Sequence, residues 1–489
     1  MSEPRRASFL GPLLPWLLLG GILGLALLLV LTRPLATNDY AIYVAMGRQM
    51  WAQGALLEQD PFTFTLYGQD WQHASWAYAM VCAGSHELWG WQGVRALVAT
   101  AVLLTLGGTW LTARRAGAAP AAAAVAVVYA WVLLLQNLGP RGQTLIYPLF
   151  LLLVALLLRP PRPVSSALSG LALGWIWTQL HGSFPIGILY AGAVAVGSAV
   201  QHRTLRAGIP AAAVGAGFLL GSMMGPYGPG IWAYVHANGA ILRGRHILEW
   251  YAPSPMSFAG LRLWAVIALW AALLLRRRGR MTATHWLLLL GFVAMSLTAT
   301  RIIAWLGLAT AVPLALSLTA PSAQATRAAV LSGRQRAALA GASLLWLGLL
   351  VKGTPLEVQL APDTPVDLAE RLAQEPPGGR LFAPFEASSY LAMRFHRSSA
   401  SPDEPLGSME RPYFLDMRTW IYPDDIWDEY MSISAAEPGW EARLEAWNVT
   451  HLLLSHSFHG EGLMPAARSS ARWELLAEDG AGALLRRVD

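Results

Sequence analysis

The sequence is poor in charge. Only 13% of its 489 residues are Asp, Glu, Lys or Arg, whereas 55% are hydrophobic. A soluble chain of this length would carry roughly a quarter charged residues. The deficit is concentrated in residues 1–350, where apolar runs long enough to cross a bilayer recur. An ordinary soluble globular protein is therefore excluded.

Lysine and cysteine are nearly absent as well. Lys352 is the only lysine and Cys82 the only cysteine. One cysteine excludes an intramolecular disulfide framework, and no CxxC or Cys/His set points to zinc. The net charge of +6 comes from arginines in short clusters between apolar runs. That distribution follows the positive-inside rule and does not indicate a nucleic-acid partner.

The N-terminus resembles a secretory signal only superficially. Arg5 and Arg6 precede an apolar stretch from Phe9 to about Thr32. This stretch is too long for the apolar region of a signal peptide, and no convincing small-residue cleavage site follows it. We expect an uncleaved first span with its N-terminus in the cytoplasm.

The apolar runs predict about eleven membrane spans. They lie at 9–32, 91–112, 118–136, 144–158, 165–181, 183–200, 207–224, 258–275, 282–298, 302–319 and 338–352. If the spans alternate in direction, every strong basic cluster falls on the cytoplasmic side, as the positive-inside rule requires. The clusters are Arg114-Arg115, Arg159 and Arg162, Arg203 and Arg206, Arg276–Arg278 with Arg280, and Arg327 with Arg334 and Arg336. The expected location is a bacterial inner membrane.

The composition divides the chain into two predicted domains. Residues 1–352 form a mainly helical transmembrane bundle with external loops at 33–90 and 225–257. Residues 353–489 have the composition of a soluble domain on the periplasmic or extracellular side. There, strand-like runs at 380–385, 413–416, 449–455, 473–477 and 483–487 alternate with helix-like stretches such as 366–374 and 440–447. This alternation predicts a small α/β domain.

Polar and ionisable residues outside the basic clusters gather on the predicted external side. They are Asn38, Asp39, Asp60, Asp70, His73, Arg141, Gln143, His181, Tyr227, Arg243, Arg245, Glu249 and Arg301. An ionisable side chain at the end of a span is expensive unless it faces a cavity or a partner. We therefore expect one external cavity that holds an anion and at least one carboxylate.

Each of these residues also has a simpler interpretation. Asp39 begins a predicted helix at 39–53, and its role could be simply to cap that helix. Asp60, before Pro61, could only start a turn. Arg141 and Arg301 could be interface anchors whose side chains reach the lipid headgroups. His181, before Gly182, could be an ordinary helix end.

One mechanism unites the group. A carboxylate at the outer surface can deprotonate an acceptor hydroxyl or amine. Arginines can bind a phosphate through paired charge-assisted hydrogen bonds and stabilise it as the sugar–oxygen bond breaks. A sugar carried on a lipid phosphate needs both groups, and it needs no nucleotide outside the cell.

At these residues the sequence resembles the GT-C superfamily of integral-membrane glycosyltransferases, specifically a bacterial branch. The resemblance rests on the order of short motifs along nearly the whole chain. These are Asp39-Tyr40, DPFTFT (60–65), WQHASW (71–76), Arg141-x-Gln143, Leu180-His181-Gly182, Pro226–Gly228, Glu249-Trp250, Arg301, Asp416-x-Arg418 and Pro-Gly-Trp at 438–440.

The resemblance implies a GT-C-like fold, a polyprenyl-phosphate sugar as donor, and a glycan, lipid or protein outside the cytoplasm as acceptor. It implies that Asp39 is the general base and that Asp60 and His73 complete the catalytic group on the acceptor side. Arg141, Arg245 and Arg301 are the expected phosphate contacts. Asn38, Tyr40, Gln143, His181, Tyr227, Arg243, Glu249 and Trp250 are expected to line the site. Many members have two acids in the first external loop, whereas this chain has Asn38-Asp39; a divalent cation stays open as a cofactor.

Two other functions remain alternatives. A membrane scaffold or assembly subunit could keep the fold without turnover, and the lone acid Asp39 favours it. A transporter of lipid-linked glycans would show ionisable residues deep within spans or broken helices in paired repeats. The ionisable residues cluster at span ends instead, so the transporter ranks third.

Overall fold

A computed structural model describes residues 13–245, 247–276, 281–320, 358–376, 378–396 and 409–488. The chain forms two compact units, each assembled from two stretches of sequence. The first consists of Met1–Arg33 with Arg95–Leu356, and the second of Pro34–Val94 with Glu357–Asp489. The predicted span 338–352 and the basic residues Arg327, Arg334 and Arg336 lie outside the described residues.

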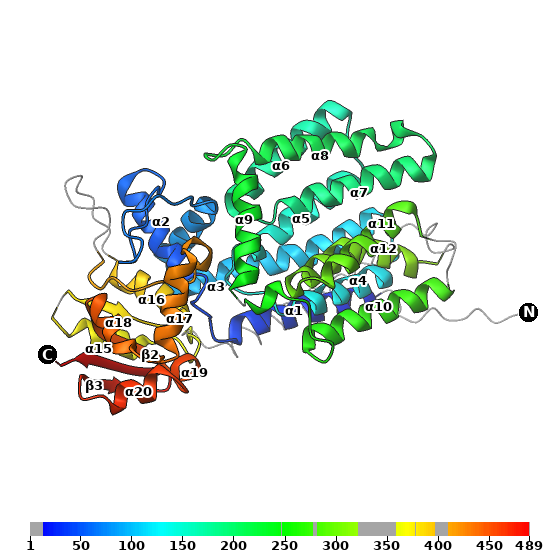
Figure 1. The fold of residues 1–489 in the computed structure, drawn as a ribbon. Coiled ribbons are helices and arrows are strands. Elements are labelled where there is room, and N and C mark those ends of the chain that lie inside the picture. The colour runs from blue at the N-terminus through cyan, green and yellow to red at the C-terminus, as the bar shows by residue number, and fades with distance from the viewer. Residues whose placement is uncertain are drawn as a thin grey trace, which may run out of the picture. The chain divides into compact units, whose positions relative to one another are not determined.

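The first unit is a bundle of helices (Figure 1). Its helices are α1 (Leu14–Thr32), the second part of α3 (Trp76–Arg115), α4 (Pro120–Leu134), α5 (Gly142–Leu158), α6 (Pro163–Leu180), α7 (Pro185–His202), α8 (Ile209–Ser222), α9 (Gly230–Gly244), α10 (Phe258–Arg276), α11 (Ala283–Ser296) and α12 (Ile303–Leu318). Helix α3 is interrupted at Trp89 and Gly90, where Gly90 has φ 56°. That interruption lies just before residue 91, where the sequence predicted a span to begin.

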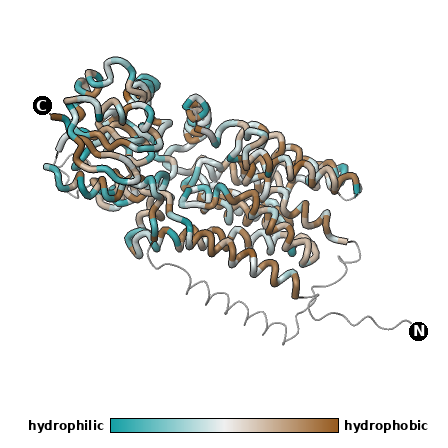
Figure 2. The backbone as a smooth tube through the Cα atoms, turned by 90° about the horizontal axis from the view of Figure 1, so that it is seen from below, coloured by the Kyte–Doolittle hydropathy of each residue, from teal (hydrophilic) through white to brown (hydrophobic). Residues whose placement is uncertain are grey.

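Hydrophobic residues dominate these helices (Figure 2). Among the described residues, five helical stretches are long and apolar enough to cross a membrane: Leu14–Thr32, Trp76–Arg115, Leu205–Ser222, Phe258–Arg276 and Thr300–Leu318. Pro120–Leu134, Gly142–Leu158 and Ala283–Ser296 are apolar but shorter. A helix occupies every predicted span within the described residues. That eleven helices cross the bilayer remains a prediction.

Helices α6 and α8 approach each other unusually closely. A Cβ atom on Gly217 of α8 would lie 1.9 Å from the carbonyl oxygen of Ala167, and one on Gly174 of α6 would lie 2.2 Å from that of Phe218. Small residues let helix backbones pack tightly where lipid supplies no hydrophobic drive for association. The glycines of these two helices therefore let their backbones pack tightly.

A buried arginine joins α10 to the end of α4. Arg262 donates to the carbonyl oxygens of Val132 (2.9 Å) and Leu133 (3.3 Å) and also binds Gln136. These carbonyls belong to the last turn of α4, where no intrahelical donors remain. The contact satisfies a charge that an apolar helix could not otherwise bury.

The second unit is built around a four-stranded mixed sheet. Its strands are β1 (Arg380–Phe382), β2 (Val449–Ser455), β3 (Trp473–Glu478) and β4 (Gly482–Arg487), in the order β1-β2-β4-β3. Strand β1 is parallel to β2, and the other pairs are antiparallel. Four of the five predicted strand regions are confirmed. Residues 413–416 form no strand; Tyr413 makes only isolated bridges to Thr63 and Leu381.

Both stretches of sequence contribute helices and core to this unit. The helices are α2 (Ala41–Gln53), the first part of α3, α15 (Val366–Ala373), α16 (Phe385–Phe395), α17 (Asp424–Ser434), α18 (Trp440–Ala446), α19 (His456–His459) and α20 (Leu463–Ser469). Buried Ile42 and Met46 of α2 share one hydrophobic cluster with Leu391 and Phe395 of α16. The segments Pro34–Val94 and Glu357–Asp489 therefore fold as one body.

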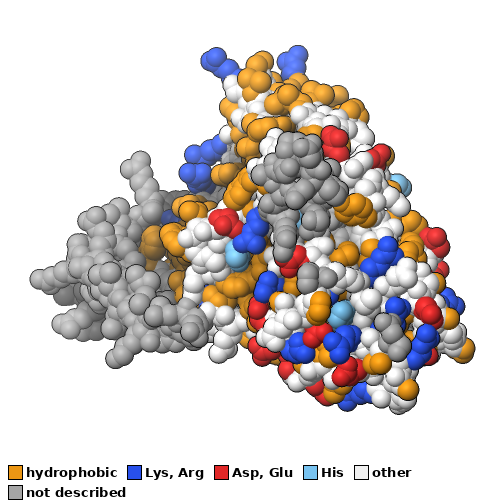
Figure 3. Space-filling model, turned by 90° about the vertical axis from the view of Figure 1, so that its left-hand side faces the viewer, with side chains coloured by type: hydrophobic (Ala, Val, Ile, Leu, Met, Phe, Trp, Pro, Cys, Tyr) orange, Lys and Arg blue, Asp and Glu red, His pale blue; other side chains and the backbone are white. Residues whose placement is uncertain are grey.

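Charged side chains of both signs are interspersed on the face shown in Figure 3. Exposed ion pairs within the second unit include Arg394–Glu370 at 2.8 Å and Arg486–Glu474 at 2.7 Å. Such pairs contribute little individually to stability.

Candidate functional site

The predicted site residues divide between the two units. Arg141, Gln143, His181, Tyr227, Arg243, Arg245, Glu249, Trp250 and Arg301 belong to the first unit, and Asn38, Tyr40, Asp39, Asp60 and His73 belong to the second. Within each unit the structure brings a subset of them into contact.

In the first unit, two arginines from different elements meet one carboxylate. Arg141 is the N-cap residue of α5, and Arg301 lies in the 3₁₀ turn η3 (Thr300–Ile302) that leads into α12. Glu249 lies in the 3₁₀ turn η2 (Leu248–Trp250). Arg141 Nη1 is 3.0 Å from Glu249 Oε2, and Arg301 Nη1 is 3.4 Å from Glu249 Oε1. Each carboxylate oxygen thus faces one guanidinium.

Neighbouring groups hold Arg301 in place. Its Nη2 lies 3.4 Å from Gln143 Oε1, and its guanidinium lies 4.3 Å above the ring of Trp250. A guanidinium over an indole face is favourable because the ring face carries partial negative charge. The backbone N–H of Thr300 donates to the Tyr251 carbonyl at 2.9 Å, which ties η3 to the segment after η2. The structure therefore unites Arg141, Gln143, Glu249, Trp250 and Arg301.

This group is reachable from outside the protein. The side chains of Arg141, Glu249 and Arg301 are 44%, 33% and 17% exposed. Two planar guanidiniums aimed at one oxyanion are a recurrent way to recognise carboxylate or phosphate. The arrangement can bind an anion that offers at least two oxygen atoms.

The remaining predicted residues of this unit lie at helix ends. His181 follows α6, and its Nδ1 lies 2.9 Å from the Ser183 hydroxyl. Arg245 is buried at the C-terminus of α9, and the backbone carbonyl of Arg243 accepts a hydrogen bond from the Tyr251 hydroxyl at 2.7 Å. Tyr227 lies in the turn between α8 and α9. The Arg243–Tyr251 contact joins the end of α9 to the segment that carries Glu249.

In the second unit, Asp39 stands immediately before α2 and is half-buried. The N-cap residue is Tyr40, which makes no side-chain capping bond. The N–H of Tyr40 bonds to the Thr37 carbonyl at 3.1 Å, while the Thr37 hydroxyl lies 3.2 Å from that of Thr364. Asp39 is thus carried on a turn that is fixed on both sides.

A small polar hollow adjoins this turn. It is lined by Thr37, Asn38, Asp363, Thr364, Pro384, Glu386, Ala387, Ser455 and Ser457. Partial burial and the nearby charges of Asp363 and Asp39 raise the pKa of Glu386. Carboxylates from three segments therefore influence one another beside α2.

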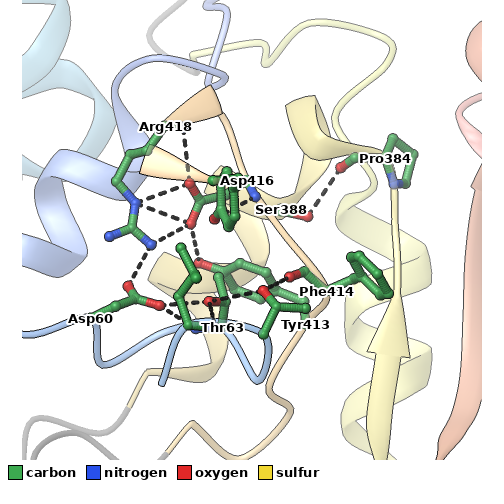
Figure 4. Close-up of polar contacts among 11 residues, drawn as sticks. Asp60, Thr63, Pro384, Ser388, Tyr413, Phe414, Asp416 and Arg418 are labelled. Carbon is green, nitrogen blue, oxygen red and sulfur yellow. Dashed lines mark hydrogen bonds and ion pairs between the residues drawn. The ribbon is translucent and has the colours of Figure 1, made fainter. Parts of the chain in front are cut away.

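Asp60 occupies a different, fully buried position (Figure 4). Its Oδ2 accepts hydrogen bonds from the Thr63 hydroxyl at 2.6 Å and the Thr63 N–H at 3.1 Å. This is the turn-initiating role that Asp60-Pro61 suggested in the sequence. Its Oδ1 also pairs with Arg418 Nη2 at 2.6 Å, and the same guanidinium binds Asp416 at 2.7 Å. The sequence did not predict that pairing of Asp60 with Arg418.

Aromatic rings enclose this buried cation. The Arg418 guanidinium lies 4.6 Å from the Trp71 ring, which stacks on His73 at 4.8 Å. Burial would lower the pKa of Arg418, but the carboxylates of Asp416 and Asp60 outweigh it and raise that pKa well above its usual value. Burial and the charge of Arg418 lower the pKa of His73 to about 3. His73 is therefore a neutral packing partner at physiological pH.

The sequence left a divalent cation open as a cofactor. Within the described ranges, no three or more His, Cys, Asp or Glu side chains are grouped so that they could hold a metal ion.

No family model matches the sequence, and no curated protein matches it. Solved structures, in contrast, match the fold over nearly the whole chain. ArnT from Cupriavidus metallidurans bound to undecaprenyl phosphate aligns with a TM-score of 0.54 and 14% identity, over 98% of this chain and 99% of that one. The arabinofuranosyltransferase AftD from Mycobacteria aligns with a TM-score of 0.53 and 15% identity, over 97% of this chain and 40% of that one. The apo oligosaccharyltransferase from Archaeoglobus fulgidus aligns with a TM-score of 0.54 and 10% identity, over 92% of this chain and 70% of that one.

These matches define the fold. The chain has the fold of the GT-C membrane glycosyltransferases, as its motif order suggested, and it is a multi-pass membrane protein. At these identities the comparison establishes the fold, so function must be argued from the residues.

Proposed function

We propose that this protein is a glycosyltransferase that moves a sugar from a polyprenyl-phosphate donor to a glycan, lipid or protein acceptor outside the cytoplasm. The observation that carries the proposal is the convergence of Arg141 and Arg301 on one oxyanion in a chain with the GT-C fold. A lipid-phosphate donor suits such a group. The negative charge on its departing phosphate must be stabilised by protein cations, because no nucleotide takes part. One matched protein, ArnT, is described with undecaprenyl phosphate bound.

In this proposal the two arginines bind the donor phosphate. The sugar–phosphate bond breaks between the anomeric carbon and its oxygen, and the negative charge on the departing phosphate increases. Guanidiniums already aimed at an oxyanion stabilise this change without reorganising. Arg245, close in sequence to Glu249, is proposed as a further phosphate contact, and Gln143, His181, Tyr227, Arg243 and Trp250 are proposed to line the site.

Asp39 is the proposed general base. Its carboxylate accepts the proton of the acceptor hydroxyl or amine as that atom forms its bond to the anomeric carbon. The products are the glycosylated acceptor and the polyprenyl phosphate. Asn38 and Tyr40 flank the base, while Asp60 and His73 act on the acceptor side by fixing the loop that contains them.

The site is proposed to face the periplasm or cell exterior of a bacterial inner membrane, with the N-terminus in the cytoplasm. The arginine clusters between the helices support this orientation through the positive-inside rule. The donor's polyprenyl chain would then remain in the lipid while its phosphate reaches the surface.

A transfer assay with a matched control tests the proposal. The parent protein, Asp39→Asn and Asp425→Asn are reconstituted in lipid with radiolabelled polyprenyl-phosphate sugars and an envelope acceptor fraction. Asp425 is a suitable control because it is an exposed acid in the first turn of α17. We expect transfer by the parent and by Asp425→Asn, and a loss of at least about a hundredfold in Asp39→Asn. Equal transfer by all three proteins would remove Asp39 from the mechanism.

A further inference from the structure

Glu249 is isolated in the sequence. Between Glu87 and Glu357 it is the only acidic residue, whereas arginines are frequent in the same region. Solubility cannot explain one carboxylate in so long a stretch. Its position must be explained by what it contacts.

The contacts of Glu249 are those of a small bound anion. Its two oxygen atoms lie 3.0 Å and 3.4 Å from the guanidiniums of Arg141 and Arg301. The phosphodiester of a polyprenyl-phosphate sugar presents two non-bridging oxygens and one negative charge in the same way, and the polyprenyl phosphate product presents three oxygens with at least equal charge. The carboxylate therefore occupies the place that a phosphate oxygen pair would take.

The segment that carries Glu249 is fixed while its side chain can leave. Backbone bonds from Trp250 N–H to the Ile247 carbonyl (3.0 Å) and from Thr300 N–H to the Tyr251 carbonyl (2.9 Å) hold the main chain. The Glu249 side chain is 33% exposed, so rotation about its own bonds brings the carboxylate into water. Departure of the carboxylate needs no rearrangement of η2.

We propose that Glu249 is a resident counter-ion that occupies the arginine pair until a phosphate-bearing ligand displaces it. This inference rests on the proposed function, in which Arg141 and Arg301 bind the donor phosphate. The bound carboxylate keeps the two guanidiniums together when no donor is present. It also lowers the net affinity for phosphate, because every binding event must break two ion pairs. After transfer, its return competes with the polyprenyl phosphate product and favours product release.

Direct binding tests the displacement. The reconstituted full chain is titrated with ³²P-labelled farnesyl phosphate, inorganic phosphate and, as a phosphate-free competitor, farnesol. The variants are Glu249→Gln, Glu249→Asp, Arg141→Gln and Arg301→Gln. Arg276→Gln is the matched control, because Arg276 is an exposed arginine at the end of α10.

The proposal gives a clear order of affinities. Glu249→Gln should bind farnesyl phosphate roughly three- to thirtyfold more tightly than the parent, the range expected when two exposed ion pairs no longer compete. The Asp side chain in Glu249→Asp is too short to bridge both arginines. The affinity of this variant for farnesyl phosphate should therefore lie between those of the parent and Glu249→Gln. Either arginine variant should bind more weakly, and Arg276→Gln should match the parent. Farnesol should not displace the label, and tighter binding of farnesyl phosphate than of inorganic phosphate identifies a lipid-borne ligand.

The opposite results are distinguishable. If both arginine variants weaken binding while Glu249→Gln binds equally or more weakly, the phosphate site stands and the displaced counter-ion is refuted. If the arginine variants bind as the parent does, the phosphate site of the proposed function fails, and the displacement fails with it.

Discussion

A single guanidinium serves two carboxylates in the interior of the second unit. Arg418 contacts both Asp60 and Asp416, and all three side chains are at most 1% exposed. Such a group adds little net stability compared with apolar packing, but breaking it leaves uncompensated charge in a low-dielectric interior. Asp60 is thereby committed to holding the loop 60–65 against residues 413–418.

Removal of Arg418 should therefore be severe. We predict that Arg418→Gln destabilises the second unit by about 3–5 kcal/mol, because two buried carboxylates lose their counter-ion. Arg394→Gln, which breaks the exposed pair with Glu370, should change stability by no more than about 1 kcal/mol. Thermal unfolding and the protease sensitivity of residues 54–75 measure the difference. Equal effects of the two substitutions would show that the buried group is not the main link between these segments.

The residues of this group were visible in the sequence, but their pairing was not. Asp60 was expected as a turn initiator, and Asp416 with Arg418 stood out as a short motif. More than 350 positions separate Asp60 from Arg418, and no local periodicity specifies a contact over that distance. The contact of Glu249 with Arg141 and Arg301 escaped prediction for the same reason: the sequence predicted a common side of the membrane for these residues, but it did not predict their pairing.

Elements were easier to predict than contacts. Each described span was anticipated as a helix because a long apolar run can satisfy its backbone only internally when surrounded by lipid. Four of the five strand regions of the tail were found as well. The exception is residues 413–416, where Tyr413 makes isolated bridges to Thr63 and Leu381. The apolar residues of this segment are buried in the core, but they do not form a strand of the sheet. Burial without regular pairing cannot be separated from a strand by pattern alone.

The tight packing of helices α6 and α8 provides a prediction at the scale of the elements. Gly217→Ala should destabilise the first unit by about 1–3 kcal/mol, since its new Cβ would meet the Ala167 carbonyl oxygen at 1.9 Å. Gly192→Ala in α7 is the matched control because no atom lies within 4 Å of a Cβ placed there. It should be neutral or stabilising by up to about 1 kcal/mol. Thermal unfolding in one detergent compares them; a tolerated Gly217→Ala would refute close α6–α8 packing.

At the scale of the whole molecule, fold and chemistry rest on different evidence. The order of motifs suggested the GT-C fold, and structural matches over nearly the full chain support that fold at 10–15% identity. The second unit combines residues 34–94 with 357–489 through a shared core. A change in the tail should therefore reach the loop that carries Asp39. The proposed chemistry depends on a few side chains, and it must be tested by measuring sugar transfer.

The most direct test is the stoichiometry of that reaction. Purified protein in lipid is supplied with a doubly labelled polyprenyl-phosphate sugar and an envelope acceptor fraction, and in parallel with the corresponding nucleotide sugar. We expect one polyprenyl phosphate to be released for each sugar transferred, and no transfer from the nucleotide sugar. Transfer from the nucleotide sugar, or no transfer from any polyprenyl-phosphate donor while farnesyl phosphate still binds, would contradict it.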